Sequence, residues 1–195
     1  TNWVSSAGPF VERFERETAA YVGVPHPVAI VNGSAALHLA LSAAGVRPDD
    51  EVLTPTLTFI ATAGAIVHAG AHPVFLDVEP VTWGLDPEKV ADFLTRECEV
   101  RAGVVIDRVT GRRVSAMVPV HLYGHPCDLD PLLEICTRWP LAMVEDATES
   151  LGAFYRGRRV GADGSSGILS FNGNKIITCG GGGMVLTRHA EVAAR

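Results

Sequence analysis

The sequence predicts an α/β protein with a largely parallel sheet. Short runs rich in β-branched residues alternate with helical patterns, turn residues mark the junctions, and no repeat, low-complexity tract or interdomain linker interrupts the alternation. At 195 residues the chain is long enough to bury a substantial core within one domain. We therefore expect one domain, with its active groups at the C-terminal ends of the strands.

Helix and strand alternate regularly in the first half of the chain. Apolar residues at helical spacing predict a first helix that ends near Gly23. The turn at Asn32-Gly33-Ser34 leads from a strand into a second helix, for which Gly45 is a plausible stop. Pro87 occupies a first-turn position of a later helix. The predicted helices cover about 10–22, 34–44, 58–69 and 86–95, and the predicted strands cover 28–31, 51–54 and 74–77.

The second half of the chain continues the alternation. Thr110-Gly111 supplies a hairpin turn between two predicted strands, and a later apolar strand delivers Glu145 and Asp146 at its C-terminal end. The chain enters without methionine and stops inside a starting helix, so we expect a fragment truncated at both ends. The predicted strands cover 104–106, 114–120, 141–144, 168–171 and 184–186, with a helix at 130–138 and a loop at 161–167.

Composition excludes several classes of protein. The net charge is −6, and the short basic run Arg156, Arg158 and Arg159 is better explained as a solvated hairpin than as a nucleic-acid patch. The four cysteines show neither a C-x-x-C pair nor zinc spacing, which indicates reduced thiols. Neither a signal pattern nor an apolar stretch of membrane-spanning length is present. We expect a cytoplasmic protein that binds neither nucleic acid nor membranes.

Lys175 is the most informative residue. The chain has 14 arginines but only two lysines, and Lys89 lies in a helical run where a surface charge is ordinary. Lys175 lies between apolar neighbours, where the charged amine loses solvation and the neutral, nucleophilic form becomes accessible. A neutral amine can form a Schiff base with an aldehyde such as pyridoxal 5′-phosphate (PLP). The alternative is a lysine whose side chain extends from a loop to water.

The turn Asn32-Gly33-Ser34-Ala35 is a candidate anion site. Free backbone N–H groups and the helix dipole attract anions there, Gly33 allows close approach, and Ser34 adds a hydroxyl donor. The alternative is an N-cap serine without a ligand. The glycines at 180–183 match no phosphate-loop pattern because a strand follows them, so we interpret them as a flexible connection required by close packing.

Asp146 follows an apolar strand directly. A carboxylate at a strand end can hold a pyridinium N–H and so preserve the ring as an electron sink, although a helix N-cap is the alternative role. If a helical turn begins there, Glu149 shares the face of Asp146 and reaches a ring hydroxyl or bound water.

Other side chains follow neighbouring strand ends. Phe59 stands at a strand-to-helix junction, where it can stack on a flat ring or pack in the core. His121 and Tyr123 are expected to line the same crevice. A metal site built from His121, His125 and Asp128 is disfavoured because no further ligand pattern supports it.

Together these segments resemble the nucleotide-sugar aminotransferases of the DegT/StrS type, a branch of the fold-type I PLP enzymes. The resemblance covers nearly the whole chain and implies the three-layer α/β/α large domain of that fold, over residues 1–195, without the small C-terminal domain. The matching segments are ordered along the chain: 1–6, 32–37, 55–62, 119–124, 145–147 and 170–183.

The resemblance implies a role for each candidate residue. Lys175 is the implied Schiff-base lysine and proton shuttle, Asp146 the partner of the pyridine nitrogen, and Glu149 a neighbour of the ring hydroxyl. Many relatives have Gln at the position of Glu149 and Thr at that of Cys179, whereas the related sugar dehydratases carry histidine in place of the lysine. The other implied cofactor residues are Phe59 for ring stacking, and Gly33, Ser34, Ala35, Ser170 and Asn172 around the phosphate.

The segment 97–113 looks like the insertion of the subgroup that makes legionaminic acid and bacillosamine precursors. The resemblance then implies ping-pong transfer of an amino group from glutamate to C4 of a nucleotide-linked 4-keto-6-deoxy (N-acetyl)hexosamine, by a homodimer with shared active sites. Three alternatives remain at this point: a non-catalytic PLP-fold regulator or assembly protein, a PLP-dependent sugar dehydratase relative, and a nucleotide-binding domain that uses Gly33-Ser34 alone.

Overall fold

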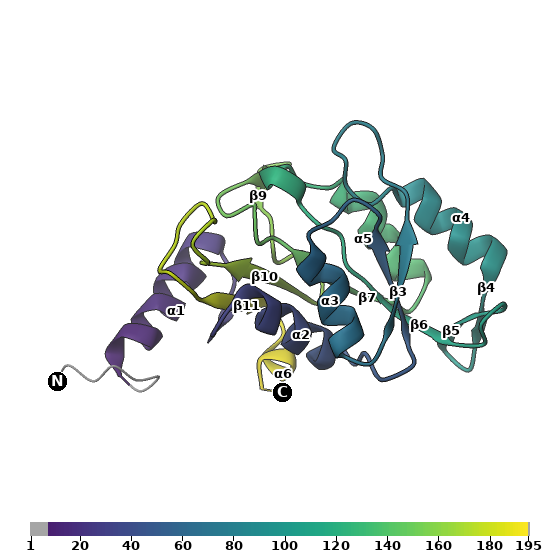
Figure 1. The fold of residues 1–195 in the computed structure, drawn as a ribbon, viewed down its shortest axis with the longest axis horizontal. Coiled ribbons are helices and arrows are strands. Elements are labelled where there is room, and N and C mark those ends of the chain that lie inside the picture. The colour runs from purple at the N-terminus through teal and green to yellow at the C-terminus, as the bar shows by residue number, and fades with distance from the viewer. Residues whose placement is uncertain (1–7, 195) are drawn as a thin grey trace.

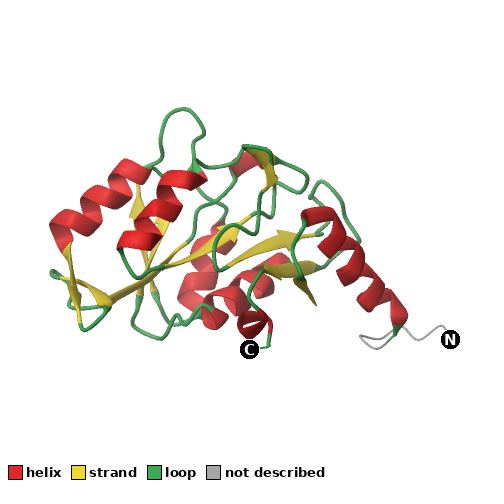
Figure 2. Ribbon diagram, turned by 180° about the vertical axis from the view of Figure 1, so that it is seen from behind, coloured by secondary structure: helices red, strands yellow, loops and turns green. Residues whose placement is uncertain are grey.

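The structure is a computed structural model that describes residues 8–194, in which helices cover both faces of a mixed sheet (Figure 1, Figure 2). The predicted α/β class is therefore confirmed. The segment 1–6 that entered the family resemblance lies outside the described residues. The helices are α1 (Pro9–Val22), α2 (Gly33–Ala43), α3 (Ile60–His68), α4 (Pro87–Glu97), α5 (Leu129–Arg138) and α6 (Ala190–Ala193), with a 3₁₀ turn η1 (Leu122–Gly124).

The main sheet has the strand order β1-β11-β10-β7-β6-β2-β3, and β5 pairs with both β6 and β4. Pairing is parallel from β10 to β3, and β11 is antiparallel to both of its neighbours, β1 and β10. It follows that β1 runs in the same direction as β10. The strands are β1 (His26–Ile30), β2 (Glu51–Pro55), β3 (His72–Leu76), β4 (Cys98–Arg101), β5 (Val104–Asp107), β6 (Arg113–Met117), β7 (Ala142–Asp146), β10 (Ser166–Ser170) and β11 (Gly183–Thr187), with a separate hairpin of β8 (Phe154–Tyr155) and β9 (Arg158–Arg159).

Alternation along the central strands explains the three layers. Val52 and Val144 pack with α2 and α3, whereas their neighbours Leu53 and Met143 pack with α4 and α5 on the opposite face. Successive strand side chains point to opposite faces, so strands that are apolar at every position bury both faces of the sheet. This arrangement brings the C-terminal ends of β1, β2, β7 and β10 to one edge.

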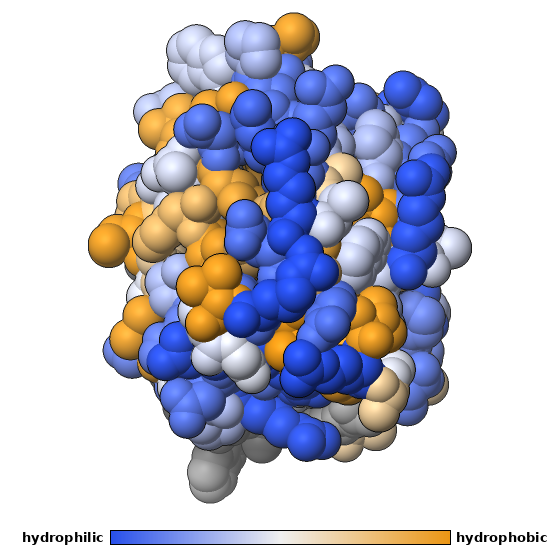
Figure 3. Space-filling model, turned by 90° about the vertical axis from the view of Figure 1, so that its right-hand side faces the viewer, coloured by the Kyte–Doolittle hydropathy of each residue, from blue (hydrophilic) through white to orange (hydrophobic). Residues whose placement is uncertain are grey.

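The segment 97–113 forms an antiparallel extension of the sheet. Only its second strand was expected, but Cys98–Arg101 forms β4 and pairs with β5 in full register. The Thr110-Gly111 turn connects β5 to β6 as predicted, since Val105 lies opposite Val114. Figure 3 looks at the right-hand side of Figure 1, where β4, β5 and α4 lie. Hydrophilic side chains cover much of this side, with apolar patches between them.

The helices of the described region are short. None of them, within residues 8–194, has both the length and the apolar character that a bilayer crossing requires.

Candidate active site

A cavity of about 260 Å³ opens at the edge where the parallel strands end. It receives side chains from the first turn of α2, the junction before α3, the end of β7 and the segment after β10. The predicted residues that line it are Gly33, Ser34, Phe59, Asp146, Ser170, Asn172 and Lys175. Three other polar lining residues, Asn32, Thr148 and Asn174, were not among the predicted site residues.

The N-terminus of α2 forms one wall of the cavity. Asn32 has extended backbone angles and its side chain accepts the Ala35 N–H at 2.8 Å, so it is the helix N-cap. This contact uses the Ala35 amide, and Ala35 does not line the cavity, which contradicts its predicted place at the ligand. Among the described residues the Ser34 N–H has no acceptor. Ser34 therefore keeps an amide donor for an anion at the positive end of the helix.

Gly33 is required by the close approach of α2 to the end of β10. A Cβ at this position would lie 2.8 Å from Ser170 Cβ and 3.0 Å from Ser170 Oγ. Ser170 Oγ accepts a long hydrogen bond of 3.4 Å from the Asn172 N–H, which leaves its own proton to donate. The glycine run is close-packed in the same way, because a Cβ at Gly183 would lie 2.4 Å from the Asn32 carbonyl.

Asp146 also lines the cavity and lies at the end of β7. Its Oδ2 accepts the Thr62 hydroxyl at 2.8 Å, and its Oδ1 accepts the Thr148 hydroxyl at 2.8 Å and the Thr148 N–H at 3.2 Å. Residues 147–153 form turns and no helix, so the alternative of a helix N-cap is excluded. The carboxylate is held at the cavity by three donors.

Lys175 projects from the loop after β10 and is almost completely buried. Its side chain is 7% exposed, and Nζ lies 3.5 Å from Glu149 Oε1 and 5.0 Å from the centre of the Phe59 ring. A lysine that extends to water is therefore ruled out. The expected source of burial is wrong, however, because the neighbours Ile176 and Ile177 are 62% and 59% exposed. Residues distant in the sequence shield the amine.

Glu149 reaches Lys175 by a route that the sequence did not predict. No helical turn follows Asp146, so the two carboxylates do not share a helix face. Instead, Glu149 Oε2 accepts the Tyr123 N–H at 2.9 Å, and its Oε1 faces Lys175 Nζ. Tyr123 itself is exposed, with a left-handed backbone angle φ of 53°. Glu149 thus contacts the amine while lying outside the set of cavity-lining residues.

His121 is buried behind the cavity, contrary to its expected place in it. Its Nε2 lies 3.1 Å from Glu145 Oε2, and its Nδ1 accepts the Cys127 N–H at 3.1 Å. Both ring nitrogens are engaged, which leaves none for a metal ion. Burial alone would raise the pKa of Glu145, but hydrogen bonds from His121 and from the Gly161 and Gly164 N–H groups lower it.

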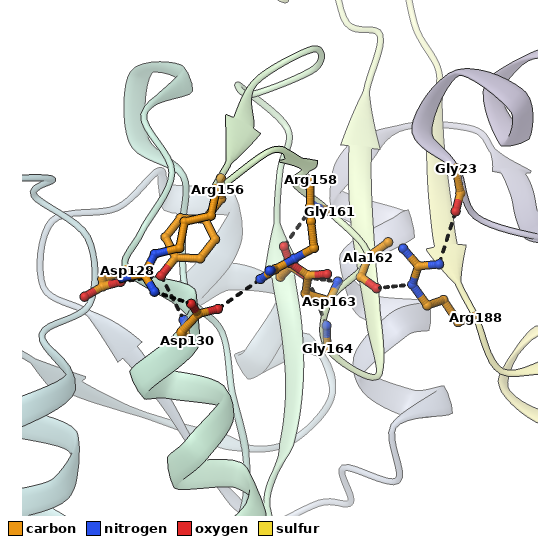
Figure 4. A network of polar contacts seen from close by, with 12 residues as sticks. Gly23, Asp128, Asp130, Arg156, Arg158, Gly161, Ala162, Asp163, Gly164 and Arg188 are labelled. Atoms are coloured by element: carbon orange, nitrogen blue, oxygen red, sulfur yellow. Dashed lines mark hydrogen bonds and ion pairs between the residues drawn. The ribbon is translucent and has the colours of Figure 1, made fainter.

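Glu145, near the end of β7, binds three backbone N–H groups of the loop whose residues are labelled in Figure 4. It accepts the Gly161, Asp163 and Gly164 N–H groups, and so fixes the loop that precedes β10. Two arginines of the β8–β9 hairpin pair with acidic partners, as expected for a solvated hairpin, whereas Arg159 lies over the rings of Tyr21 and Phe154. The ion pairs join Arg156 to Asp128 and Asp130, and Arg158 to Asp130 and Asp163 (Figure 4).

Comparison with known proteins identifies the family of the chain. The whole sequence, residues 1–195, matches the DegT/DnrJ/EryC1/StrS aminotransferase family. The chain belongs to this family. It is 45% identical over 195 residues to the GDP-perosamine synthase of Caulobacter vibrioides, covering all of this chain and 48% of that protein. The chain thus spans about half the length of the curated relatives it matches.

Solved structures of the family share the fold. The Streptomyces venezuelae DesV structure, in complex with a ketimine intermediate, superposes with a TM-score of 0.85 at 40% identity, over 97% of this chain and 47% of that one. The Bacillus subtilis NtdA structure, with bound pyridoxamine phosphate (PMP), gives a TM-score of 0.80 at 29% identity, over 96% and 39% of the two chains. PLP is the cofactor of this family. The legionaminic acid and bacillosamine subgroup finds no support among these comparisons.

The residues around the cavity fit PLP. The free Ser34 N–H and the Ser170 hydroxyl supply donors for a phosphate, and the absence of a Cβ at Gly33 lets α2 and the end of β10 bring these donors together. Asp146 offers a carboxylate to a ring N–H, Phe59 offers an aromatic face, and Lys175 offers an amine to the aldehyde. These groups line one cavity, so a single small ligand could engage them together.

Proposed function

We propose that the whole protein is a PLP-dependent aminotransferase that transfers an amino group from glutamate to C4 of a nucleotide-linked 4-keto-6-deoxy (N-acetyl)hexosamine. One observation carries this proposal: the buried Lys175 amine lines the same cavity as the Asp146 carboxylate. An amine and a carboxylate at one cavity match the two groups that a pyridine aldehyde requires. Lysine here also disfavours the dehydratase alternative, in which histidine is expected.

Each residue has a defined task in this proposal. The cofactor, when bound, supplies the electron sink that acidifies the carbon bearing the amino group. Lys175 Nζ would remove the proton from that carbon in the first half-reaction and would deliver a proton to C4 of the keto sugar in the second. Asp146 orients the ring through its nitrogen, and the α2 N-terminus with Ser170 holds the phosphate. Glu149 Oε1 lies 3.5 Å from Lys175 Nζ and so keeps the lysine side chain at the cavity.

The proposed substrate class rests on the relatives. The Caulobacter protein is named for a GDP-linked sugar amine, and this chain is 45% identical to it. This relationship supports a nucleotide-linked sugar as acceptor and favours GDP-linked over UDP-linked keto sugars as the first to test. We place the reaction in the cytoplasm, where nucleotide sugars are made.

We also propose that the site is completed by a second copy of the chain. Large apolar side chains are exposed near the cavity mouth on two segments, Phe59 with Ile60 and Ile176 with Ile177. Exposed apolar groups that gather beside a polar cavity are typical of interaction surfaces. Ile176→Glu is expected to shift a dimer toward monomer in sedimentation, whereas Val109→Glu, at an exposed position on the β5–β6 turn, leaves it unchanged.

Steady-state assays on the full-length protein test the proposed activity. With glutamate and a GDP-linked 4-keto-6-deoxy sugar, the wild type should form 2-oxoglutarate and the 4-amino sugar in equal amounts. Lys175→Ala should abolish both products, because no other described residue places an amine at the cavity. Cofactor binding without turnover, for GDP- and UDP-linked sugars alike, would instead support a non-catalytic regulator.

A further inference from the structure

The Asp146 carboxylate is held by two threonines that the proposed chemistry does not require. Thr62 lies on α3 and donates its hydroxyl to Oδ2 at 2.8 Å. Thr148 lies in the turn after β7 and donates both its hydroxyl and its N–H to Oδ1. Thr62 is 0% exposed and Asp146 is 3% exposed, so water does not compete for these hydrogen bonds.

The arrangement leaves one acceptor position on the carboxylate. An ionised carboxylate accepts about four hydrogen bonds, two at each oxygen. Thr148 fills both positions at Oδ1, whereas Thr62 fills only one at Oδ2. The open position therefore belongs to Oδ2, the oxygen that Thr62 holds.

We infer that Thr62 and Thr148 are positioning residues that fix the rotation of the Asp146 carboxylate, so that Oδ2 presents its free lone pair to the ring N–H of the cofactor. This inference rests on the proposed function, since it assigns a purpose to Asp146 as the ring partner. Without Thr62 the carboxylate is held only at Oδ1, and the free lone pair of Oδ2 is less firmly directed.

Thr62 also couples this contact to the start of α3. Phe59 is the N-cap of α3, and its carbonyl accepts the Thr62 N–H at 3.0 Å. The side chains of Phe59 and Thr62 are one helical turn apart, so one rigid helix end carries both the ring-stacking candidate and the residue that orients Asp146. A shift of α3 would therefore disturb both contacts together.

The test measures PMP affinity in the full-length protein by calorimetry. PMP carries the ring nitrogen but no aldehyde, so it reports the non-covalent contacts alone. Thr62→Val removes the donor at nearly constant volume and should raise the dissociation constant about 10-fold, the effect expected for a hydrogen bond to a charged group. Thr62→Ser keeps the hydroxyl and should bind within about twofold of the wild type. Thr148→Val should raise the dissociation constant of PMP less than Thr62→Val does, because the Thr148 N–H still donates to Asp146 Oδ1.

Thr54→Val is the matched control. Thr54 is also fully buried, but its hydroxyl bonds only weakly, at 3.4 Å, to the Val118 carbonyl. It should leave PMP affinity unchanged. If Thr62→Val does not fold, as judged by circular dichroism, the pair Thr62→Ala and Thr62→Ser makes the same comparison.

A ligand in which CH replaces the ring nitrogen of PMP separates positioning from general packing. The loss caused by Thr62→Val should nearly vanish with this analogue, because no ring N–H remains to be accepted. The inference is overturned if Thr62→Val loses equal affinity for both ligands, or if it loses no affinity for PMP. In either case, PMP binding by the wild type leaves the proposed function in place. Failure of the wild type to bind PMP overturns both.

Discussion

Lys175 Nζ lies 3.5 Å from Glu149 Oε1, although the two residues are 26 positions apart in the chain. The same carboxylate accepts the Tyr123 N–H through its other oxygen, so its position is fixed from a third segment. This contact holds the lysine side chain at the cavity. A salt bridge needs the ammonium form, whereas bonding to an aldehyde needs the neutral amine, so in the proposed function the contact must break before the amine reacts.

Glu149→Gln should therefore speed the attachment of PLP to Lys175. The amide keeps an oxygen acceptor for the Tyr123 N–H but removes the charge that stabilises the ammonium. The contact between Nζ and Oε1 is long, at 3.5 Å, so we expect only a modest rise, about threefold, in the second-order rate constant at neutral pH. Stopped-flow absorbance after mixing the apoprotein with PLP measures this rate. A slower rate would show that the carboxylate assists attachment rather than restraining the amine.

The environment of Lys175 also marks the limit of sequence reasoning. The sequence predicts that an isolated lysine among apolar residues is buried, and the side chain is buried. The cause differs, since Ile176 and Ile177 face outward while Phe59 and Glu149 shield the amine. The local sequence pattern indicates that Lys175 is unusual. Its partners Phe59 and Glu149 follow the ends of other strands, so they are identified only from the assembled sheet.

The main elements were more accessible to prediction. Apolar strands buried on both faces and glycine-marked turns identified the parallel strands and placed Gly33 and Asp146 at their ends. By contrast, β4 has the sequence Cys-Glu-Val-Arg, whose mixed polarity resembles a loop. It is a strand because β5 pairs with it. The hydrogen bond from Thr62 to Asp146 is similarly invisible in sequence, since it joins a helix to a strand across the layers.

Gly33→Ala should disrupt the site through backbone displacement. The new Cβ would lie 2.8 Å from Ser170 Cβ, so α2 and the end of β10 must separate. Overpacking of this kind costs about 2 kcal/mol of unfolding free energy, and it moves the Ser34 N–H away from Ser170. Urea denaturation and PMP titration measure the two effects.

Gly64→Ala is the control for that substitution. Gly64 lies within α3, and a Cβ there meets nothing within 4 Å. Alanine in a helix should raise the unfolding free energy by up to about 1 kcal/mol without lowering PMP affinity. If Gly33→Ala and Gly64→Ala had the same unfolding free energy and the same PMP affinity, the role assigned to the contact between α2 and β10 would be contradicted.

Glu145 should make stability depend on pH in the acid range. Its pKa is lowered in the folded state, so its contribution is complete above the ordinary glutamate value and is lost as pH falls through the lower folded value. Glu145→Gln removes a buried charge from its donors and should cost about 3 kcal/mol near neutral pH. The difference between wild type and variant should shrink on acidification.

Denaturation curves recorded across the acid range measure this difference. Glu134→Gln is the control, because Glu134 is exposed and, within residues 8–194, its only ion pair is with Arg138 one turn away. It should change the unfolding free energy by less than about 0.5 kcal/mol at any pH. If the difference in unfolding free energy between the wild type and Glu145→Gln did not change with pH, the contribution assigned to ionised Glu145 would be contradicted.

The most direct test of the central claim is to identify the lysine that bonds to the cofactor. The full-length protein is incubated with PLP, reduced with borohydride, digested and mapped by mass spectrometry. Within this chain Lys89 is the only competing lysine, and it belongs to α4, remote from the cavity residues. We expect the phosphopyridoxyl mass on the peptide that contains Lys175, and its loss in Lys175→Ala. A mass on Lys89, or no mass on Lys175, would contradict the account.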